Sequence, residues 1–252
     1  MSEQATIDIA IEQPVLVREG ARAFDSYLAH PRSGKGPGVV IFTEMWGVAP
    51  SKTEMAEEYA AAGWCALVPN MFWRSEFTGR VPFENADLAW QRLQAFDWQR
   101  AVDDARTAVQ WLRASPLCTS KVAAIGWLRG QPCCNGKVAA VGFCSGGRFA
   151  YLAAARCGAD AAASLYGLGI SEHLDEIGSV RGPLQLHDGL KDQHVPLTEI
   201  DAVAAGVQGR ADVTVFRYPE AGHSFANPVR PTYDPAATKL AGERIEAMLK
   251  GL

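Results

Sequence analysis

The feature that most constrains the fold of this chain is an apolar run that ends in a glycine-rich turn. Residues 138–141 (VAAV) lead directly into GFCSGG at 142–147. This order predicts a buried strand that turns sharply into a helix, with the apex residue strained and its side chain presented to a cleft. Cys144 occupies the apex, where the better-known form of the turn has serine. We therefore treat Cys144 as a candidate nucleophile, the alternative being a small core hydrophobe.

Length and composition place the chain among soluble globular proteins. Its 252 residues, 48% hydrophobic and 21% charged, suit a single α/β domain spanning residues 1–252. The net charge of −4, with 24 basic residues that form no cluster, argues against nucleic-acid binding. No apolar run approaches the roughly 20 residues needed to span a bilayer, so we expect no membrane segment.

The N-terminal residues and the cysteines indicate a cytoplasmic protein. Residues 1–10 carry Glu3 and Asp8 and lack the basic-then-apolar pattern of a signal peptide. The six cysteines show neither a secreted-scaffold spacing nor paired zinc-type sites. The adjacent Cys133 and Cys134 are read as two incidental thiols. We therefore expect no metal and no cofactor.

Strand and helix patterns alternate along most of the chain. Residues 6–17 largely alternate in hydrophobicity, with Pro14 as an interruption suited to an edge strand, and a turn signal leads to a second run at 23–28. These two runs predict an antiparallel N-terminal hairpin. The later pattern predicts a mostly parallel central sheet with helices on both faces. The predicted strands are 38–42, 64–68, 138–141, 161–166, 183–187 and 213–218, and the helices are 51–62, 85–114 with a break near 97, 147–156, 196–207 and 235–249.

A tandem duplication lies directly before the turn. Residues 111–126 and 127–142 match at 10 of 16 positions, and each copy contains Lys-Val-Ala-Ala. The second copy must be the strand, because it is covalently attached to Cys144. The first copy has no obvious place in the sheet and is predicted to be helical or irregular, with Thr119 or Ser120 capping a short helix through residue 129.

A catalytic thiol needs a base, and the base needs an orienting carboxylate. His223 follows the predicted strand 213–218, so it should lie at the edge of the sheet where Cys144 opens. Asp192 follows the preceding strand, and the order of nucleophile, acid and histidine matches a hydrolase triad. Asp188 is the second choice for the acid. His187, at a strand end, is the structural alternative for the histidine, and His194 is expected at the surface.

Charge that develops on a carbonyl oxygen needs two backbone N–H donors. In this architecture one belongs to the residue after the nucleophile, Ser145, and the other to the loop after strand 38–42, where Met45 lies. Glu44, in the same loop, is either a helix-start cap or a carboxylate that contacts Cys144.

Four spaced motifs resemble dienelactone hydrolase, also called carboxymethylenebutenolidase. They are VIFTEMWGV (40–48), GFCSGG (142–147), GLKDQHVP (189–196) and EAGHSFA (220–226), and the resemblance extends over nearly the whole chain. It implies an α/β-hydrolase fold without a large cap domain and a triad of Cys144, His223 and Asp192. It also implies that Glu44 holds the resting thiol until substrate binds.

The resemblance also implies where a substrate is bound. The family binds the free carboxylate of its substrate with two arginines. Arg74 is matched to the first, while the second position, four residues after His223, is Asn227 here, with Arg230 or Arg80 as possible replacements. The other residues expected at the substrate are Trp46, Tyr166, Ser224 and Phe225.

Three functions compete at this stage. The leading hypothesis is a monomeric hydrolase that opens a small lactone, dienelactone to maleylacetate, through a thioester at Cys144. The second is a promiscuous small-ester carboxylesterase of the same fold, with an acyl pocket of Phe72, Trp73, Phe77 and Phe83. The third is a catalytically silent binding protein on the same scaffold, which the complete triad spacing argues against.

Overall fold

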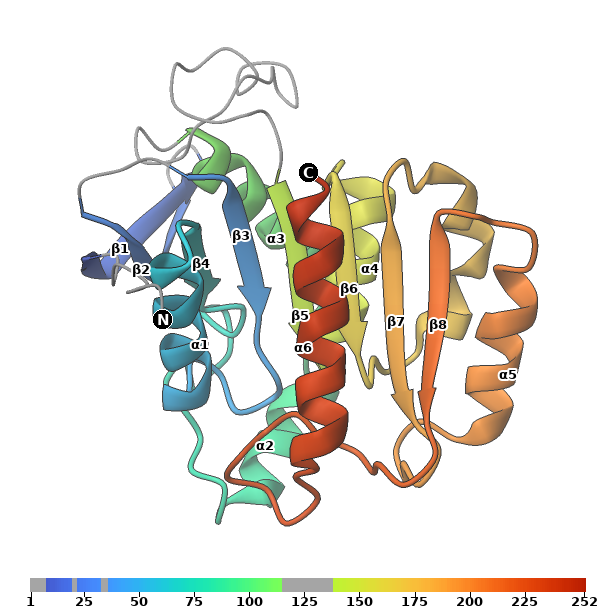
Figure 1. Ribbon diagram of the computed structural model, residues 1–252. Helices are drawn as coiled ribbons and strands as arrows, with labels where there is room; N and C mark the ends of the chain where they lie inside the picture. Colours follow the sequence, from blue (N-terminus) through green and yellow to red (C-terminus); the bar gives the residue numbers. More distant parts are fainter. Residues whose placement is uncertain (1–7, 20–21, 33–35, 115–137) are drawn as a thin grey trace.

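The computed structural model describes residues 8–19, 22–32, 36–114 and 138–252, and the strands among them form one sheet in the order β1-β2-β4-β3-β5-β6-β7-β8 (Figure 1). From β4 to β8 every neighbouring pair is parallel. The strands are β1 (Ile9–Glu19), β2 (Arg22–Pro31), β3 (Gly38–Phe42), β4 (Cys65–Pro69), β5 (Val138–Phe143), β6 (Ala161–Leu165), β7 (Leu184–Gly189) and β8 (Val213–Tyr218).

The N-terminal hairpin is confirmed. β1 pairs antiparallel with β2 at the edge of the sheet, and β2 pairs antiparallel with β4. The register of β1 shifts between Glu12 and Val15, on either side of Pro14. Proline has no N–H to donate to the ladder, so a bulge on an edge strand is where it is tolerated.

Helices cover both faces of the sheet, as the alternating pattern predicted. α1 (Pro50–Ala61) and α6 (Pro235–Lys250) lie on the near face in Figure 1, and α3 (Trp98–Ala114), α4 (Ser145–Arg156) and α5 (Leu197–Gly206) on the far face. Alternate side chains along each strand pack into two hydrophobic cores, one on each face of the sheet. In β3, Val39 and Ile41 pack on the α1/α6 side, and Val40 and Phe42 on the α3/α4 side. Such strands are buried on both faces, which explains their continuous apolar runs.

The predicted break near Asp97 is also present. α2 (Ala86–Gln94) begins at Asn85, whose side chain accepts a hydrogen bond from Leu88 N, and ends before α3. The 3₁₀ segment η2 (Ile170–Ser179) was not predicted. Within the described ranges no separate cap domain covers the sheet, and no helix of that part of the chain is long and apolar enough to cross a membrane.

The second copy of the duplication supplies a central strand. Its Val-Ala-Ala-Val-Gly segment forms β5, which pairs with β3 and β6. The first copy begins within α3, and its remainder, including the segment predicted to be helical or irregular, lies outside the described residues.

The turn after β5 requires glycine because two backbone segments nearly touch there. A Cβ on Gly142 would lie 1.8 Å from the carbonyl oxygen of Gly146, and a Cβ on Gly146 would lie 2.3 Å from that of Phe42. Neither partner is a flexible side chain that could move aside. This contact seats the N-terminus of α4 directly against the ends of β5 and β3.

We expect Gly142→Ala to lower the free energy of unfolding by more than about 3 kcal/mol, because the backbone must shift to admit the methyl group. The matched control is Gly242→Ala on the exposed side of α6, where an added Cβ meets nothing within 4 Å. In that control the free energy of unfolding should rise by about 0.5–1 kcal/mol, since glycine in the middle of a helix is less stable than alanine. Urea unfolding of both variants measures the difference, and equal stabilities would contradict the close-contact argument.

Candidate active site

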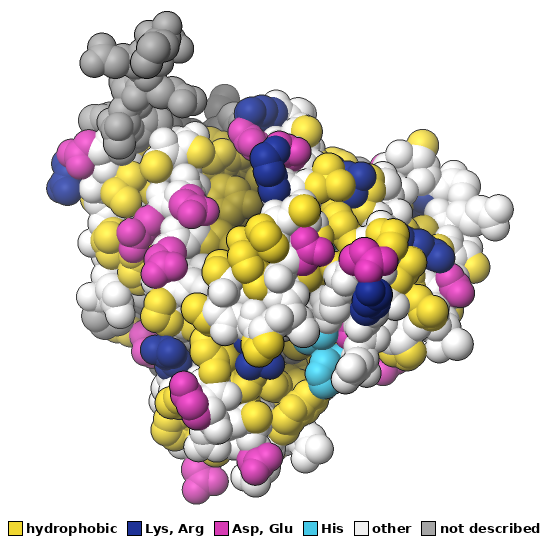
Figure 2. All heavy atoms as spheres, turned by 60° about the horizontal axis from the view of Figure 1, so that its bottom comes forward, with side chains coloured by type: hydrophobic (Ala, Val, Ile, Leu, Met, Phe, Trp, Pro, Cys, Tyr) yellow, Lys and Arg dark blue, Asp and Glu magenta, His cyan; other side chains and the backbone are white. Residues whose placement is uncertain are grey.

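The residues singled out from the sequence converge at the carboxyl edge of the parallel strands, the lower edge in Figure 1. A cavity of about 70 Å³ opens there. When this edge is turned toward the viewer, histidine side chains appear at the surface among hydrophobic ones (Figure 2). The cavity is lined by Glu44, Met45, Trp46, Ala86, Trp90, Cys144, His194, His223, Ser224 and Arg230.

Cys144 sits at the apex of the turn between β5 and α4 in a strained conformation. Its φ of 57° and ψ of −119° are unusual for a residue with a side chain. Tyr166 and Ser224 are the other non-glycine residues with positive φ in the described part of the chain, and both lie beside it. Strained backbone persists where the surrounding structure over-determines it, which is typical of functional sites. Cys144 is buried, at 5% exposure, but it lines the cavity.

His223 is held by Asp192. Its Nδ1 lies 2.7 Å from Asp192 Oδ2, and the Asp192 side chain is only 1% exposed. The other carboxylate oxygen of Asp192 accepts hydrogen bonds from the backbone N–H groups of His194 (2.7 Å) and Val195 (3.0 Å). These bonds fix the carboxylate, which in turn orients the imidazole so that its Nε2 is free to face Cys144.

The second-choice residues have other partners. His187 is fully buried, with Nδ1 2.8 Å from Tyr218 Oη and Nε2 3.1 Å from Gln185 Oε1, and burial together with Arg244 lowers its pKa to about 3. Asp188 lies on β7, where burial and the negative charge of Asp192 raise its pKa to about 7. Neither residue lines the cavity.

The charge state of His223 depends on Cys144. Burial alone lowers the pKa of the imidazolium, but the charge of the Cys144 thiolate, together with hydrogen bonds to Asp192 and Cys144, outweighs burial and raises that pKa to about 10. An imidazolium that persists at neutral pH is the counter-ion that a thiolate needs. His223 is therefore placed to act as the base and counter-ion of a Cys144 nucleophile.

Glu44 is buried beside this pair, at 2% exposure. Its Oε1 accepts a hydrogen bond from Tyr166 Oη at 3.2 Å, and its Oε2 accepts one from Asn227 Nδ2 at 3.1 Å. The described hydrogen bonds of Glu44 thus run to these two side chains and not to the Cys144 thiol. Tyr166 and Asn227, both expected at the substrate, are fully buried behind Glu44, as is Phe225, and none of the three lines the cavity.

The two expected N–H donors flank the cavity. Met45 lines it, and Ser145 is the first residue of α4, whose N–H has no carbonyl partner within the helix. The positive end of the α4 dipole adds to the attraction for a negative oxygen at this place. Trp46 and Ser224 line the cavity as expected.

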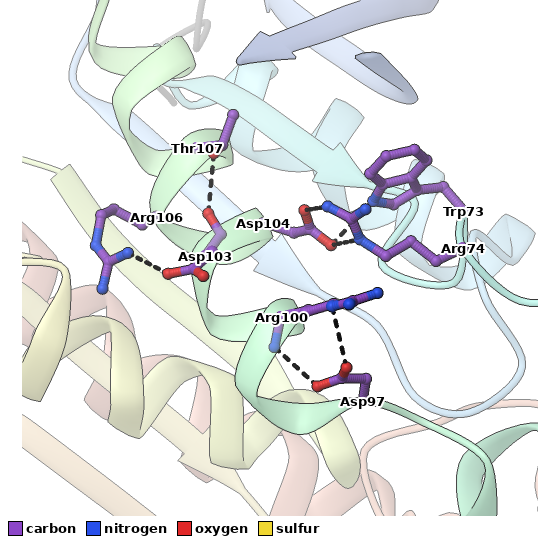
Figure 3. Close-up of polar contacts among 8 residues, drawn as sticks. All are labelled: Trp73, Arg74, Asp97, Arg100, Asp103, Asp104, Arg106 and Thr107. Atoms are coloured by element: carbon purple, nitrogen blue, oxygen red, sulfur yellow. Dashed lines mark hydrogen bonds and ion pairs between the residues drawn. The ribbon is translucent and has the colours of Figure 1, made fainter. Parts of the chain in front are cut away.

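Arg74 is placed elsewhere. It forms a two-point ion pair with Asp104 of α3, through Nη2 to Oδ1 (2.7 Å) and Nε to Oδ2 (3.0 Å), and Trp73 donates to the same carboxylate (Figure 3). These residues border a separate, larger cavity of about 770 Å³ that contains no member of the triad. α2 lies between the two cavities. Its residues Ala86 and Trp90 line the small cavity, and Leu88, Gln91 and Arg92 line the large one. The expectation that Arg74 binds the substrate is therefore not supported by its position.

Three residues of the site carried little or no signal in the sequence. Arg230 lines the cavity, and its buried Nε has no hydrogen-bond partner among the described residues. His194 is exposed, as predicted, but its ring also lies 4.7 Å from that of His223. Lys52 is buried next to Glu44, on the face of α1 that also buries Ala56 and Ala60. In the described ranges, three or more His, Cys, Asp or Glu side chains do not gather in a group that could hold a metal ion.

Known proteins resemble this chain over almost its whole length. Residues 24–252 match the model of the dienelactone hydrolase family. Carboxymethylenebutenolidase 1 of Cupriavidus pinatubonensis is 32% identical over 240 residues, covering 92% of this chain and 94% of that protein. The carboxymethylenebutenolidase of Pseudomonas putida is 31% identical, covering 88% of each chain.

Solved structures share the fold. A dienelactone hydrolase-like promiscuous phosphotriesterase from metagenomic libraries superposes with a TM-score of 0.73 at 23% identity, covering 97% of this chain and 98% of the other. A dienelactone hydrolase from Anabaena variabilis gives a TM-score of 0.65 at 18% identity, covering 94% and 96%. At these identities the likeness shows the fold alone, and it agrees with an α/β-hydrolase architecture.

We expect the His223 imidazole to titrate near pH 10 in the intact protein and much closer to its ordinary value of about 6.5 in Cys144→Ala, because the thiolate charge is then gone. NMR of histidine-labelled protein measures both midpoints. Since the folded pKa of His223 is the raised one, the contribution of its charged form to stability is present below about pH 6.5 and is lost as pH rises through about 10.

Cys65→Ala, which removes a buried thiol from β4, is the matched control and should leave the His223 titration where it is. A His223 midpoint that is the same with and without the Cys144 thiol would contradict the thiolate–imidazolium pair.

Proposed function

This chain belongs to the dienelactone hydrolase family and is a hydrolase that acts on esters, and we propose that it cleaves a small lactone or ester through attack by the Cys144 thiolate. The observation that carries the proposal is the alignment of Asp192, His223 and Cys144. The carboxylate orients the imidazole at 2.7 Å, and the charge of the thiolate stabilises the imidazolium. These are the orienter, the base and the nucleophile of a covalent hydrolase.

The proposed reaction has two steps. The thiolate forms a C–S bond to the carbonyl carbon, and the carbonyl oxygen takes the electron pair beside the N–H groups of Ser145 and Met45. Collapse of this intermediate breaks the C–O bond, and the leaving oxygen takes its proton from the His223 imidazolium. The neutral imidazole then removes a proton from water as that water attacks the thioester, which releases the acid and restores the thiolate.

The dimensions and charge of the cavity define the class of substrate. At about 70 Å³ it is far smaller than the roughly 300–1,000 Å³ of drug-sized pockets, so it accommodates a small acyl group. Arg230 is the arginine that lines it, and its guanidinium carbon lies 5.3 Å from the centre of the Trp46 ring and 5.7 Å from that of the Phe83 ring. We assign to Arg230 the role of holding a substrate carboxylate, in place of Arg74 and Asn227. Dienelactone, a small lactone with a free carboxylate, meets both conditions.

A second candidate is the hydrolysis of small neutral esters. Met45, Trp46, Ala86 and Trp90 make much of the cavity wall apolar, which favours an uncharged acyl group. The two candidates share their chemistry and differ only in whether Arg230 receives a carboxylate.

Initial rates on cis- and trans-dienelactone and on p-nitrophenyl acetate separate these functions. We expect turnover of a dienelactone, and we expect Cys144→Ser to lower kcat by more than about a hundredfold while the chain stays folded. Hydrolysis of the nitrophenyl ester alone would favour the esterase. Absence of turnover on all three, with Cys144 inert to iodoacetamide, would contradict the proposed catalysis.

The role of Arg230 has its own test. Arg230→Gln should raise KM for dienelactone about tenfold, since a hydrogen bond to a charged group contributes roughly 1.5–3 kcal/mol, and should leave p-nitrophenyl acetate hydrolysis unchanged. Arg80→Gln is the matched control, because Arg80 is exposed and does not line the cavity. Equal effects on the charged and neutral substrates would contradict the assignment.

A further inference from the structure

Lys52 is a buried lysine on a helix face that otherwise carries alanine. It lies in the first turn of α1, and its residue is 2% exposed, like Ala56 and Ala60 one and two turns further along the same face. Residues spaced by four lie on one side of a helix. Lysine is almost never fully buried unless it is paired, so its presence in this row calls for a partner.

The partner is Glu44. Lys52 Nζ lies 3.8 Å from Glu44 Oε1, and both side chains are almost completely shielded from solvent, at 2% and 3% exposure. The ammonium also lies 3.5 Å from the centre of the Phe143 ring, one residue before Cys144. The net effect on the pKa of Lys52 is a lowering, because burial outweighs the opposing charges of Glu44 and Cys144, so the charge of this lysine depends on both neighbours.

Without Lys52 the site would contain an uncompensated charge. The other two groups on Glu44, the Tyr166 hydroxyl and the Asn227 amide, are neutral donors. A like charge close by disfavours ionisation, so a bare Glu44 carboxylate would oppose a thiolate in the same buried site. His223 compensates a negative charge on Cys144, and Lys52 is the cation that compensates the negative charge of Glu44. The titratable and charged groups that face this site are Glu44, Lys52, Cys144, Tyr166, Asp192, His194, His223 and Arg230.

We propose that Lys52 is a positioning residue whose ammonium neutralises Glu44, so that the Cys144 thiolate can form beside a buried carboxylate. The proposal rests on the proposed function only in taking Cys144 as the nucleophile. It assigns Lys52 no contact with substrate.

The test is the rate of Cys144 alkylation by iodoacetamide as a function of pH, followed by mass spectrometry of the peptide that contains Cys144. Lys52→Met keeps the length of the side chain and removes its charge. We expect it to slow alkylation at pH 7 about tenfold and to move the midpoint of the rate profile upward by about one pH unit. Lys239→Met, which removes an exposed lysine of α6, is the matched control and should give the wild-type profile.

A double variant distinguishes an effect of the Lys52 charge from an effect of its packing. If Lys52 acts by neutralising Glu44, then Lys52→Met/Glu44→Gln should alkylate within about threefold of the wild-type rate, because both buried charges are gone. Should Lys52→Met fail to fold, comparing this double variant with Glu44→Gln alone gives the same answer, and the two profiles should agree within about threefold.

Three results would overturn the proposal. One is a Lys52→Met profile that coincides with the wild-type profile. Another is a double variant as slow as Lys52→Met, which would assign the effect to packing. A third is a large effect of Lys52→Met in the Glu44→Gln background. Failure of the proposed function is distinct, since Cys144 would then be alkylated slowly already in the wild-type chain.

Discussion

The close approach of two backbone segments at the turn after β5 is the contact on which the rest of the site depends. Because Gly142 meets the carbonyl of Gly146, and Gly146 meets that of Phe42, the start of α4 is pressed against the ends of β5 and β3. Cys144 thereby shares one cavity with Glu44 and Met45, and Ser145 follows it as the first residue of α4. A single methyl group at either glycine would separate the nucleophile from the loop that completes its surroundings. The strain at Cys144 is held in place by this packing.

Around the turn, buried charges occur in matched sets. Cys144 lies beside the His223 imidazole, Glu44 has the Lys52 side chain, and Asp192 has three hydrogen-bond donors. In a site shielded from water, charges interact strongly with one another. Removing one charged group therefore alters the protonation of the others. The buried carboxylate beside the nucleophile is thus tolerable only because a lysine occupies a core position of α1.

The residues expected at the substrate do not all lie at the small cavity. Arg74 is held by Asp104 behind α2, and Asn227 is turned inward to Glu44. Arg230 instead reaches the cavity between two aromatic rings. Relatives at 31–32% identity match this chain over 88–94% of their own length, and residues on loops vary more readily than the strands that support them. The chemistry and the choice of substrate are therefore separable properties of this chain.

Local patterns were sufficient to predict most of the fold. The apolar runs, the edge proline and the glycines of the turn predicted the strands, the hairpin and the position of Cys144, because each depends on residues adjacent in the chain. The spacing also singled out Asp192 and His223, and in the folded chain His223 Nδ1 lies 2.7 Å from Asp192 Oδ2. The surroundings of three other residues depended instead on which loops and helices meet in space. These residues are Lys52, Arg74 and Arg230. Only the tertiary structure decided these, because an ion pair or a cavity wall joins residues whose separation along the sequence carries no information about their contact.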